Sequence, residues 1–225
     1  MIRSLWAALR AHLPRRRPDF ASRPVLVVVE GKHDIEFLTR VSAALKDADA
    51  GLPDLAEMEQ AGKLLFIPFG GGDVLAWANR LAALKQVEFH LYDREAPPET
   101  DVRQRAARIV NVRPRCRAFV TKKRSLENYL APSAIREIGG LEVSFSDDDD
   151  VADLVAQKAW SMAGNDPPWQ LLPGRARKRL RERAKRWLNT HAAARMTAQR
   201  IDECDPAGEI RGWLQTIARL AWEAR

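Results

Sequence analysis

The chain has 225 residues, enough for one good-sized domain or for a domain with an appendage. Its 46% hydrophobic residues are typical of a globular protein, and 37 Lys and Arg against 30 Asp and Glu give a net charge of +7. The sequence has no apolar window near the about 18 residues of a transmembrane helix, and its two cysteines exclude a disulfide framework. We therefore expect a cytoplasmic protein that has no membrane partner.

The first 22 residues are predicted to form an amphipathic helix and a linker. Apolar side chains recur at helical spacing over residues 1–13, with Arg3 and Arg10 between them. A signal peptide would need an unbroken apolar stretch and a small-residue cleavage site, and neither is present. A basic, Pro-containing stretch then leads to residue 23.

Strands and helices are predicted to alternate from residue 23 to residue 140. Residues 25–29 form a continuous, mostly β-branched apolar run, which is typical of a strand buried on both faces of a parallel sheet. By their patterns, further strands are expected at 63–69, 87–92 and 117–121, and helices at 34–45, 74–81 and 101–110. This alternation predicts an α/β, Rossmann-like fold in which helices flank a mostly parallel sheet.

Residues 141–225 are predicted to form a helical C-terminal region. The acidic residues Asp147 to Asp150 precede a helical pattern, and we interpret them mainly as helix caps, with metal binding as the lesser alternative. Helices are expected at 175–188 and 206–224, the second with Asp205 as its N-cap and Pro206 at its first position. Residues 151–225 carry a net charge of +6, against +1 for residues 1–150.

One segment of this region concentrates positive charge. Residues 175–186 include eight Lys or Arg and one Glu, an array that attracts a phosphate backbone. The alternative is an ordinary solvated helix face. The predicted nucleic-acid contacts are Arg175, Arg177, Lys178, Arg179, Arg181, Lys185 and Arg186.

Acidic side chains follow three of the predicted strands. Glu30 follows the first strand, Asp73 the second, and Asp93 and Glu95 the third, while Asp34 lies in the first turn of a helix. Ligands of open parallel sheets collect outside the carboxyl ends of the strands, and Mg²⁺ prefers carboxylate oxygens. Asp73 is well placed as a helix N-cap, whereas Glu30 has no capping role at the end of a buried strand. The pattern predicts a divalent metal site at this edge.

Three segments resemble motifs of one known family. Residues 30–34 (Glu-Gly-Lys-His-Asp) resemble the Glu-Gly-x-x-Asp motif of the Toprim domain, and residues 93–95 (Asp-Arg-Glu) resemble its Asp-x-Asp motif. Residues 123–130 (Lys-Arg-Ser-Leu-Glu-Asn-Tyr-Leu) are similar to a segment in the Toprim regions of OLD-family (overcoming lysogenization defect) nucleases. The resemblance covers residues 24–131 and implies a Toprim-like catalytic domain over residues 23–140.

The resemblance also implies residue roles in metal-dependent phosphodiester cleavage. The acids of the first two motifs would hold one or two Mg²⁺ or Mn²⁺ ions: Glu30, Asp34, Asp93 and Glu95. Glu30 would also act in catalysis, together with Glu127 from the third motif. Lys123, or its neighbour Lys122, would support the negative charge of the transition state.

The sequence departs from the family pattern in two ways. The second acid of the Asp-x-Asp motif is Glu95, whose side chain is one methylene longer. The phosphate-binding Gly-x-x-x-x-Gly-Lys-Ser/Thr loop of the family's ATPase domain is absent, so any dependence on ATP would require a separate ATPase subunit. The amphipathic residues 1–13 are one place where such a subunit could dock.

The expected function is therefore a divalent-metal-dependent endonuclease that cleaves DNA, in defence or repair. An RNA-processing Toprim nuclease is an alternative, because such proteins share the Glu-Gly-x-x-Asp motif, but the Glu-Asn-Tyr-Leu segment favours the OLD family and DNA. A second alternative is a non-catalytic nucleic-acid-binding or regulatory module with a vestigial metal site. The sequence leaves the oligomeric state open.

Overall fold

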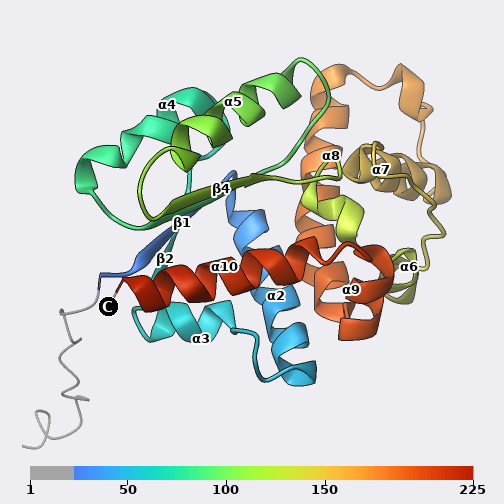
Figure 1. The fold of residues 1–225 in the computed structure, drawn as a ribbon. Coiled ribbons are helices and arrows are strands. Elements are labelled where there is room, and N and C mark those ends of the chain that lie inside the picture. Colours follow the sequence, from blue (N-terminus) through green and yellow to red (C-terminus); the bar gives the residue numbers. More distant parts are fainter. Residues whose placement is uncertain (1–22, 225) are drawn as a thin grey trace, which may run out of the picture.

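The computed structural model describes residues 23–224 and has a central four-stranded sheet (Figure 1). The strands are β1 (Val25–Val29), β2 (Leu64–Pro68), β3 (Glu88–Tyr92) and β4 (Cys116–Val120). They are parallel throughout, in the order β2-β1-β3-β4. The predicted α/β fold class is confirmed, and each strand lies within one residue of its expected range. The predicted amphipathic helix and linker at residues 1–22 lie outside the described residues.

Helices cover both faces of the sheet (Figure 1). On one face lie α4 (Val74–Arg80) and α5 (Glu99–Asn111), and on the other α2 (Lys32–Ala48), α3 (Leu55–Gln60) and α10 (Glu209–Glu223). Successive side chains of a strand point to opposite faces, so β1 contributes Val28 to one hydrophobic cluster and Val27 and Val29 to the other. The unbroken apolar run of β1 thus reflects its burial on both sides.

Four further helices lie together beside the sheet (Figure 1). They are α6 (Pro132–Gly139), α7 (Val151–Met162), α8 (Gly174–Trp187) and α9 (Ala198–Cys204), joined by short helical turns. Within residues 23–224, no helix has the length and apolar character needed to cross a membrane.

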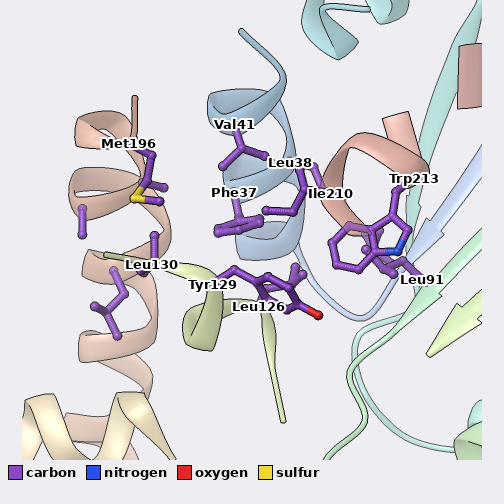
Figure 2. Close-up of a cluster of buried hydrophobic side chains, with 14 of the residues drawn as sticks. Phe37, Leu38, Val41, Leu91, Leu126, Tyr129, Leu130, Met196, Ile210 and Trp213 are labelled. Carbon is purple, nitrogen blue, oxygen red and sulfur yellow. The ribbon is translucent and has the colours of Figure 1, made fainter. Parts of the chain in front are cut away.

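The C-terminal helices share one hydrophobic core with the sheet. Figure 2 shows Phe37 of α2 close to Tyr129, and Ile210 and Trp213 of α10 beside them. The rings of Tyr129 and Trp213 meet edge to face, with their centroids 5.4 Å apart. This buried cluster contains residues from both sides of the predicted domain boundary at residue 140, and the boundary itself stays a prediction.

The last helix begins later than the sequence indicates. α10 starts at Glu209, after Gly208 in the left-handed conformation at φ 67°, so Asp205 and Pro206 are not its N-cap and first residue. That prediction was wrong because residues 206–208 form a turn. The carboxylate of Asp205 nevertheless accepts a hydrogen bond of 2.8 Å from the backbone N–H of Ile210, and so it still caps the first turn.

Two other predicted caps are confirmed. Asp73 is the N-cap of α4 and accepts a hydrogen bond from the backbone N–H of Ala76. Asp150, the last residue of the acidic run, is the N-cap of α7 and accepts one from the backbone N–H of Asp153. The interpretation of the acidic run as a helix-capping segment therefore holds for Asp150.

Because α10 is part of the shared core, truncating one of its buried side chains should destabilise the whole fold. Leu214 of α10 is fully buried, and Leu214→Ala is expected to lower the free energy of unfolding by about 2–5 kcal/mol, measured by urea denaturation. Leu171 is 72% exposed, and Leu171→Ala should change it by less than about 0.5 kcal/mol. Equal effects of the two substitutions would contradict the shared core.

Candidate metal centre

The two central strands end beside each other at the carboxyl edge of the sheet. The order β2-β1-β3-β4 places β2 and β3 on opposite sides of β1, so the chain changes its winding direction between β1 and β3. Such switch points are where open α/β sheets bind ligands. Glu30 follows β1, and Asp93 and Glu95 follow β3, and one carboxylate oxygen from each lies within 4.8 Å of the other two. The structure therefore brings together three of the four predicted metal ligands.

The fourth predicted ligand, Asp34, lies in the first turn of α2. Its Oδ2 accepts a hydrogen bond of 2.8 Å from the backbone N–H of Gly31, the N-cap residue that follows Glu30. Its Oδ1 lies 3.9 Å from Nζ of Lys185. Asp34 thus borders the three-carboxylate group and faces the ammonium of Lys185.

Two carboxylate oxygens of the centre have no hydrogen-bond donor. Among residues 23–224, Oδ1 of Asp34 and Oδ2 of Asp93 are buried without a hydrogen-bond partner, and both residues are only 3% exposed. The other oxygen of Asp93 accepts a hydrogen bond of 3.1 Å from the backbone N–H of Leu126. A buried polar atom that lacks its partner is costly, and a cation is the natural partner for a carboxylate oxygen.

Burial and mutual repulsion perturb the pKa values of these acids. Burial raises the pKa of Asp93 well above its ordinary value and that of Asp34 to about 6, while the charge of Lys185 opposes both shifts. Burial and the nearby Glu30 also raise the pKa of Glu95. Burial and mutual repulsion thus disfavour the ionised acids, and a divalent cation would add to the positive charge that Lys185 supplies.

Helix α8 supplies one positive charge to the centre. Nζ of Lys185 lies 3.7 Å from Oδ2 of Asp93 and 3.7 Å from Oε1 of Glu127. The attraction of Glu127, Asp93 and Asp34 outweighs burial and raises the pKa of Lys185 well above its ordinary value, so the side chain is an ammonium ion. The sequence pattern assigned Lys185 to a nucleic-acid surface, and the structure places its charged group among the carboxylates.

The Glu-Asn-Tyr-Leu segment ties the centre to the C-terminal helices. Oε1 of Glu127, a predicted catalytic residue, accepts a hydrogen bond of 2.6 Å from Nδ2 of Asn189, and Glu127 is buried. Asn128 donates to the backbone carbonyls of Ser146 and Asp149, at 2.9 and 3.0 Å. These three hydrogen bonds connect the segment to different parts of the C-terminal region. The next residue, Tyr129, adds a further connection by packing against Trp213 of α10.

Lys123, the other predicted catalytic residue, contacts different groups. Its Nζ lies 2.9 Å from Oδ1 of Asp147, donates to the carbonyl of Asn128 at 3.2 Å, and lies 5.2 Å from the centre of the Tyr129 ring. The backbone N–H of its neighbour Lys122 bonds to the carboxylate of Glu209. The structure does not bring Lys123 and the four predicted ligands together, and its catalytic role stays a prediction.

Arginines hold the outer acids of the centre. Nε of Arg103, from α5, donates to Oε1 of Glu30 at 3.0 Å. Nε of Arg124 lies 3.9 Å from Oε2 of Glu95. Glu95 itself has a φ of 56°, and its backbone N–H donates to the carbonyl of Arg124 at 2.8 Å, so the loop after β4 fixes its unusual conformation.

The other predicted nucleic-acid contacts divide into two groups. Arg181 anchors α8, because its Nε donates to Oδ2 of Asp150 at 2.8 Å. The remaining side chains are exposed on the same helix: Arg175, Arg177, Lys178, Arg179 and Arg186. These five place a positive surface on the helix that also carries Lys185.

Comparison with known proteins finds that the chain is similar to solved structures. No family model matches the chain, and no curated protein matches it. Two solved structures of the C-terminal region of the Xanthomonas campestris pv. campestris OLD protein are similar to it, at 19% and 18% identity with TM-scores of 0.49 and 0.47. The matches cover 92% and 89% of this chain and 97% of each of those chains. These structural neighbours belong to the family that the sequence motifs resemble.

The raised pKa of Asp34 predicts a pH-dependent gain of stability when its charge is removed. Its pKa rises from 3.8 to about 6 in the folded chain, so the folded state loses stability as the pH increases through this range. In EDTA, Asp34→Asn should increase the free energy of unfolding by about 1–3 kcal/mol near pH 8 and by much less near pH 4.

The matched control is Asp47→Asn, at an exposed position of the same helix. It should change the free energy of unfolding by less than about 0.5 kcal/mol at either pH. Urea denaturation of the three proteins measures these differences, and a loss of stability of Asp34→Asn near pH 8 would show that this carboxylate is well compensated without an added cation.

Proposed function

We propose that the chain is a divalent-metal-dependent nuclease that hydrolyses phosphodiester bonds of DNA. The observation that carries the proposal is the group of three carboxylates, from Glu30, Asp93 and Glu95, whose oxygens lie within 4.8 Å of one another at the switch point of the sheet. Carboxylates that lie this close together repel one another, and a bound cation would offset that repulsion. The exposed positive residues of α8 support a polyanionic substrate.

The donor set fits Mg²⁺ or Mn²⁺. Glu30, Asp93 and Glu95 offer three hard carboxylate oxygens within 4.8 Å of one another, and such ions take several oxygen ligands from carboxylates, waters and phosphates. When bound, the ion would supply Lewis-acid chemistry, by lowering the pKa of a bound water and polarising a phosphoryl oxygen.

The chain's own residues would orient the ligands and stabilise charge. Arg103 fixes the carboxylate of Glu30, and Leu126 fixes that of Asp93 through its backbone N–H. Lys185 would place a fixed positive charge beside the reacting phosphate, where negative charge develops. Glu127 holds the ammonium of Lys185 and is itself held by Asn189, so we assign it a positioning role.

Three finer points belong to the same proposal. Lys123 stays a second candidate for stabilising the transition state, since its charged partner Asp147 is largely exposed. The preference for DNA over RNA is supported by the Glu-Asn-Tyr-Leu segment, which resembles the OLD family. A separate ATPase subunit would account for any dependence on ATP.

Removal of one metal ligand should abolish cleavage. Supercoiled plasmid, single-stranded DNA and RNA are incubated with the protein and with Mg²⁺, Mn²⁺ or EDTA. Glu30→Gln and Asp93→Asn are each expected to lower the cleavage rate by about 100-fold or more, because each removes a charged ligand and leaves the side-chain volume unchanged. The reaction rate is followed on gels.

Glu142→Gln is the matched control, because Glu142 is an exposed acid that lies 4.0 Å from Arg136. It should cleave at the wild-type rate. The nuclease proposal would be contradicted if the protein bound these nucleic acids tightly and in a salt-sensitive way but cleaved none of them in any metal. If Glu30→Gln and Asp93→Asn also left that binding unchanged, a binding module would be favoured.

The positive face of α8 should contribute to DNA affinity through phosphate contacts. In a Glu30→Gln background that prevents cleavage, the triple substitution Arg175→Gln, Lys178→Gln and Arg179→Gln is expected to weaken binding. The slope of log Kd against log salt should fall by about 2–3, close to one for each lost phosphate contact. Fluorescence anisotropy with labelled duplex DNA measures the slope.

A control with an equal change of net charge separates phosphate contacts made by α8 from the effect of the net charge of the whole chain. Lys63→Gln, Lys85→Gln and Arg219→Gln remove three exposed positive charges from positions outside α8. The slope should then change by less than about one. Equal changes in the two triple variants would contradict a binding surface on α8.

A further inference from the structure

We infer that Arg94 and Lys123 form a binding site for DNA phosphates beside the metal centre, and that Asp147 and Asp148 occupy this site in the free chain. The inference rests on the proposed function, in which DNA is the substrate. Arg94 is the middle residue of the Asp-Arg-Glu motif, which supplies two of the three carboxylates of the centre. A basic side chain at this position is next to the place where a phosphodiester would react.

The turns that follow β3 and β4 hold the two basic residues together. The hydroxyl of Thr121 accepts a hydrogen bond of 2.9 Å from the backbone N–H of Arg94 and donates one of 2.7 Å to the backbone carbonyl of Lys123. Both charged groups contact the same residue, Asp147: the guanidinium of Arg94 donates to its backbone carbonyl at 3.3 Å, and Nζ of Lys123 lies 2.9 Å from its Oδ1. The structure therefore places two positive charges side by side.

Two consecutive acids face these charges. The carboxylate of Asp147 pairs with Lys123, and that of Asp148 pairs with Arg94. The acidic side chains are 64% and 78% exposed, whereas those of Lys123 and Arg94 are 16% and 30% exposed. Ion pairs with such exposed partners contribute little to stability, so an incoming anion can replace the carboxylates.

The basic side chains have other contacts that keep them in place. Nζ of Lys123 also donates to the carbonyl of Asn128 at 3.2 Å and lies 5.2 Å from the centre of the Tyr129 ring. Arg94 keeps its bond to the backbone carbonyl of Asp147 whatever the charge of the acidic side chains. The two positive charges are thus positioned before a phosphate arrives.

The backbone of the acidic segment is likewise held without its exposed carboxylates. The backbone N–H of Arg124 donates to the carbonyl of Asp147 at 2.7 Å. The side-chain amide of Asn128 donates to the carbonyls of Ser146 and Asp149. Replacing the two exposed carboxylates by amides should therefore remove their charge and leave the segment where it is.

A strand of DNA offers the same pattern of charge as the two acids, because its phosphate groups follow one another along the backbone. Guanidinium and ammonium groups are well suited to bind phosphate. A strand whose phosphodiester lies at the metal centre would carry its neighbouring phosphates past this edge of the sheet. Each phosphate that binds Arg94 or Lys123 must displace a carboxylate, so Asp147 and Asp148 lower the affinity for DNA.

The affinity for labelled duplex DNA, measured by fluorescence anisotropy, tests this competition. All variants carry Glu30→Gln to prevent cleavage. Asp147→Asn with Asp148→Asn is expected to lower Kd by about 3- to 30-fold at about 0.15 M salt, because two competing ion pairs are lost. In a chain that also carries Arg94→Gln and Lys123→Gln, the same pair should change Kd by less than about 2-fold, because nothing remains to compete for.

Asp47→Asn with Glu57→Gln is the matched control, because it removes two exposed acids outside the acidic segment. It should change Kd by less than about 2-fold, since charges farther from the bound strand than a Debye length are screened. This control alone tests the inference if the chain with Arg94→Gln and Lys123→Gln does not fold.

The outcomes separate this inference from the proposal on which it rests. An equal gain of affinity with and without Arg94 and Lys123, or an equal gain in the control pair, would overturn the inference and leave the nuclease proposal standing. No gain from Asp147→Asn with Asp148→Asn would do the same. No binding of DNA by any of the chains would overturn the DNA substrate and the inference together.

Discussion

The carboxylates at the carboxyl edge of the sheet need positive charge nearby, because burial disfavours their charged forms, and the ammonium of Lys185 lies within 4 Å of those of Asp34, Asp93 and Glu127. This requirement follows from where the acids lie. Parallel strands end at one edge, so Glu30 after β1 and Asp93 after β3 meet although more than 60 residues separate them along the chain. Burial makes their repulsion expensive, as the raised pKa values of Asp34 and Asp93 show.

The position of Lys185 depends in turn on the C-terminal helices. α8 is fixed by the ion pair between Arg181 and Asp150 and by the residues that follow it into the core. The Glu-Asn-Tyr-Leu segment joins these helices to the sheet, because Glu127 faces Lys185 while Tyr129 packs edge to face against Trp213. The hydrophobic core and the charged centre are therefore coupled, and the helical region completes the site that the sheet begins.

The strands and the acids that follow them could be predicted because their signals are local. The apolar run of β1 ends directly at Glu30, and a helix with Asp34 in its first turn follows at once. The grouping of the carboxylates of Glu30, Asp93 and Glu95 then followed from the parallel order of the strands. Short helices such as α6 and α9 have too few residues for a clear periodic pattern, and the sequence did not predict them.

The role of Lys185 could not be predicted, because it depends on how a distant helix packs. Within α8 it is one of many basic residues, and its only local signal is its place beside Ala184, on the edge of the buried face. Lys123, by contrast, is near the acids in sequence, yet the turn after β4 directs its ammonium to Asp147. The predicted start of α10 was wrong for a related reason. The carboxylate of Asp205 accepts a hydrogen bond from the backbone N–H of Ile210, and the Asp-Pro pair in the sequence does not indicate the turn that lies between them.

The central claim is that a divalent ion binds between the carboxyl ends of β1 and β3. The most direct measurement is anomalous diffraction at the manganese edge from crystals of the chain grown with Mn²⁺. The account predicts an anomalous peak bounded by Glu30, Asp93 and Glu95. Absence of a peak at this edge, with manganese bound elsewhere or not at all, would contradict it.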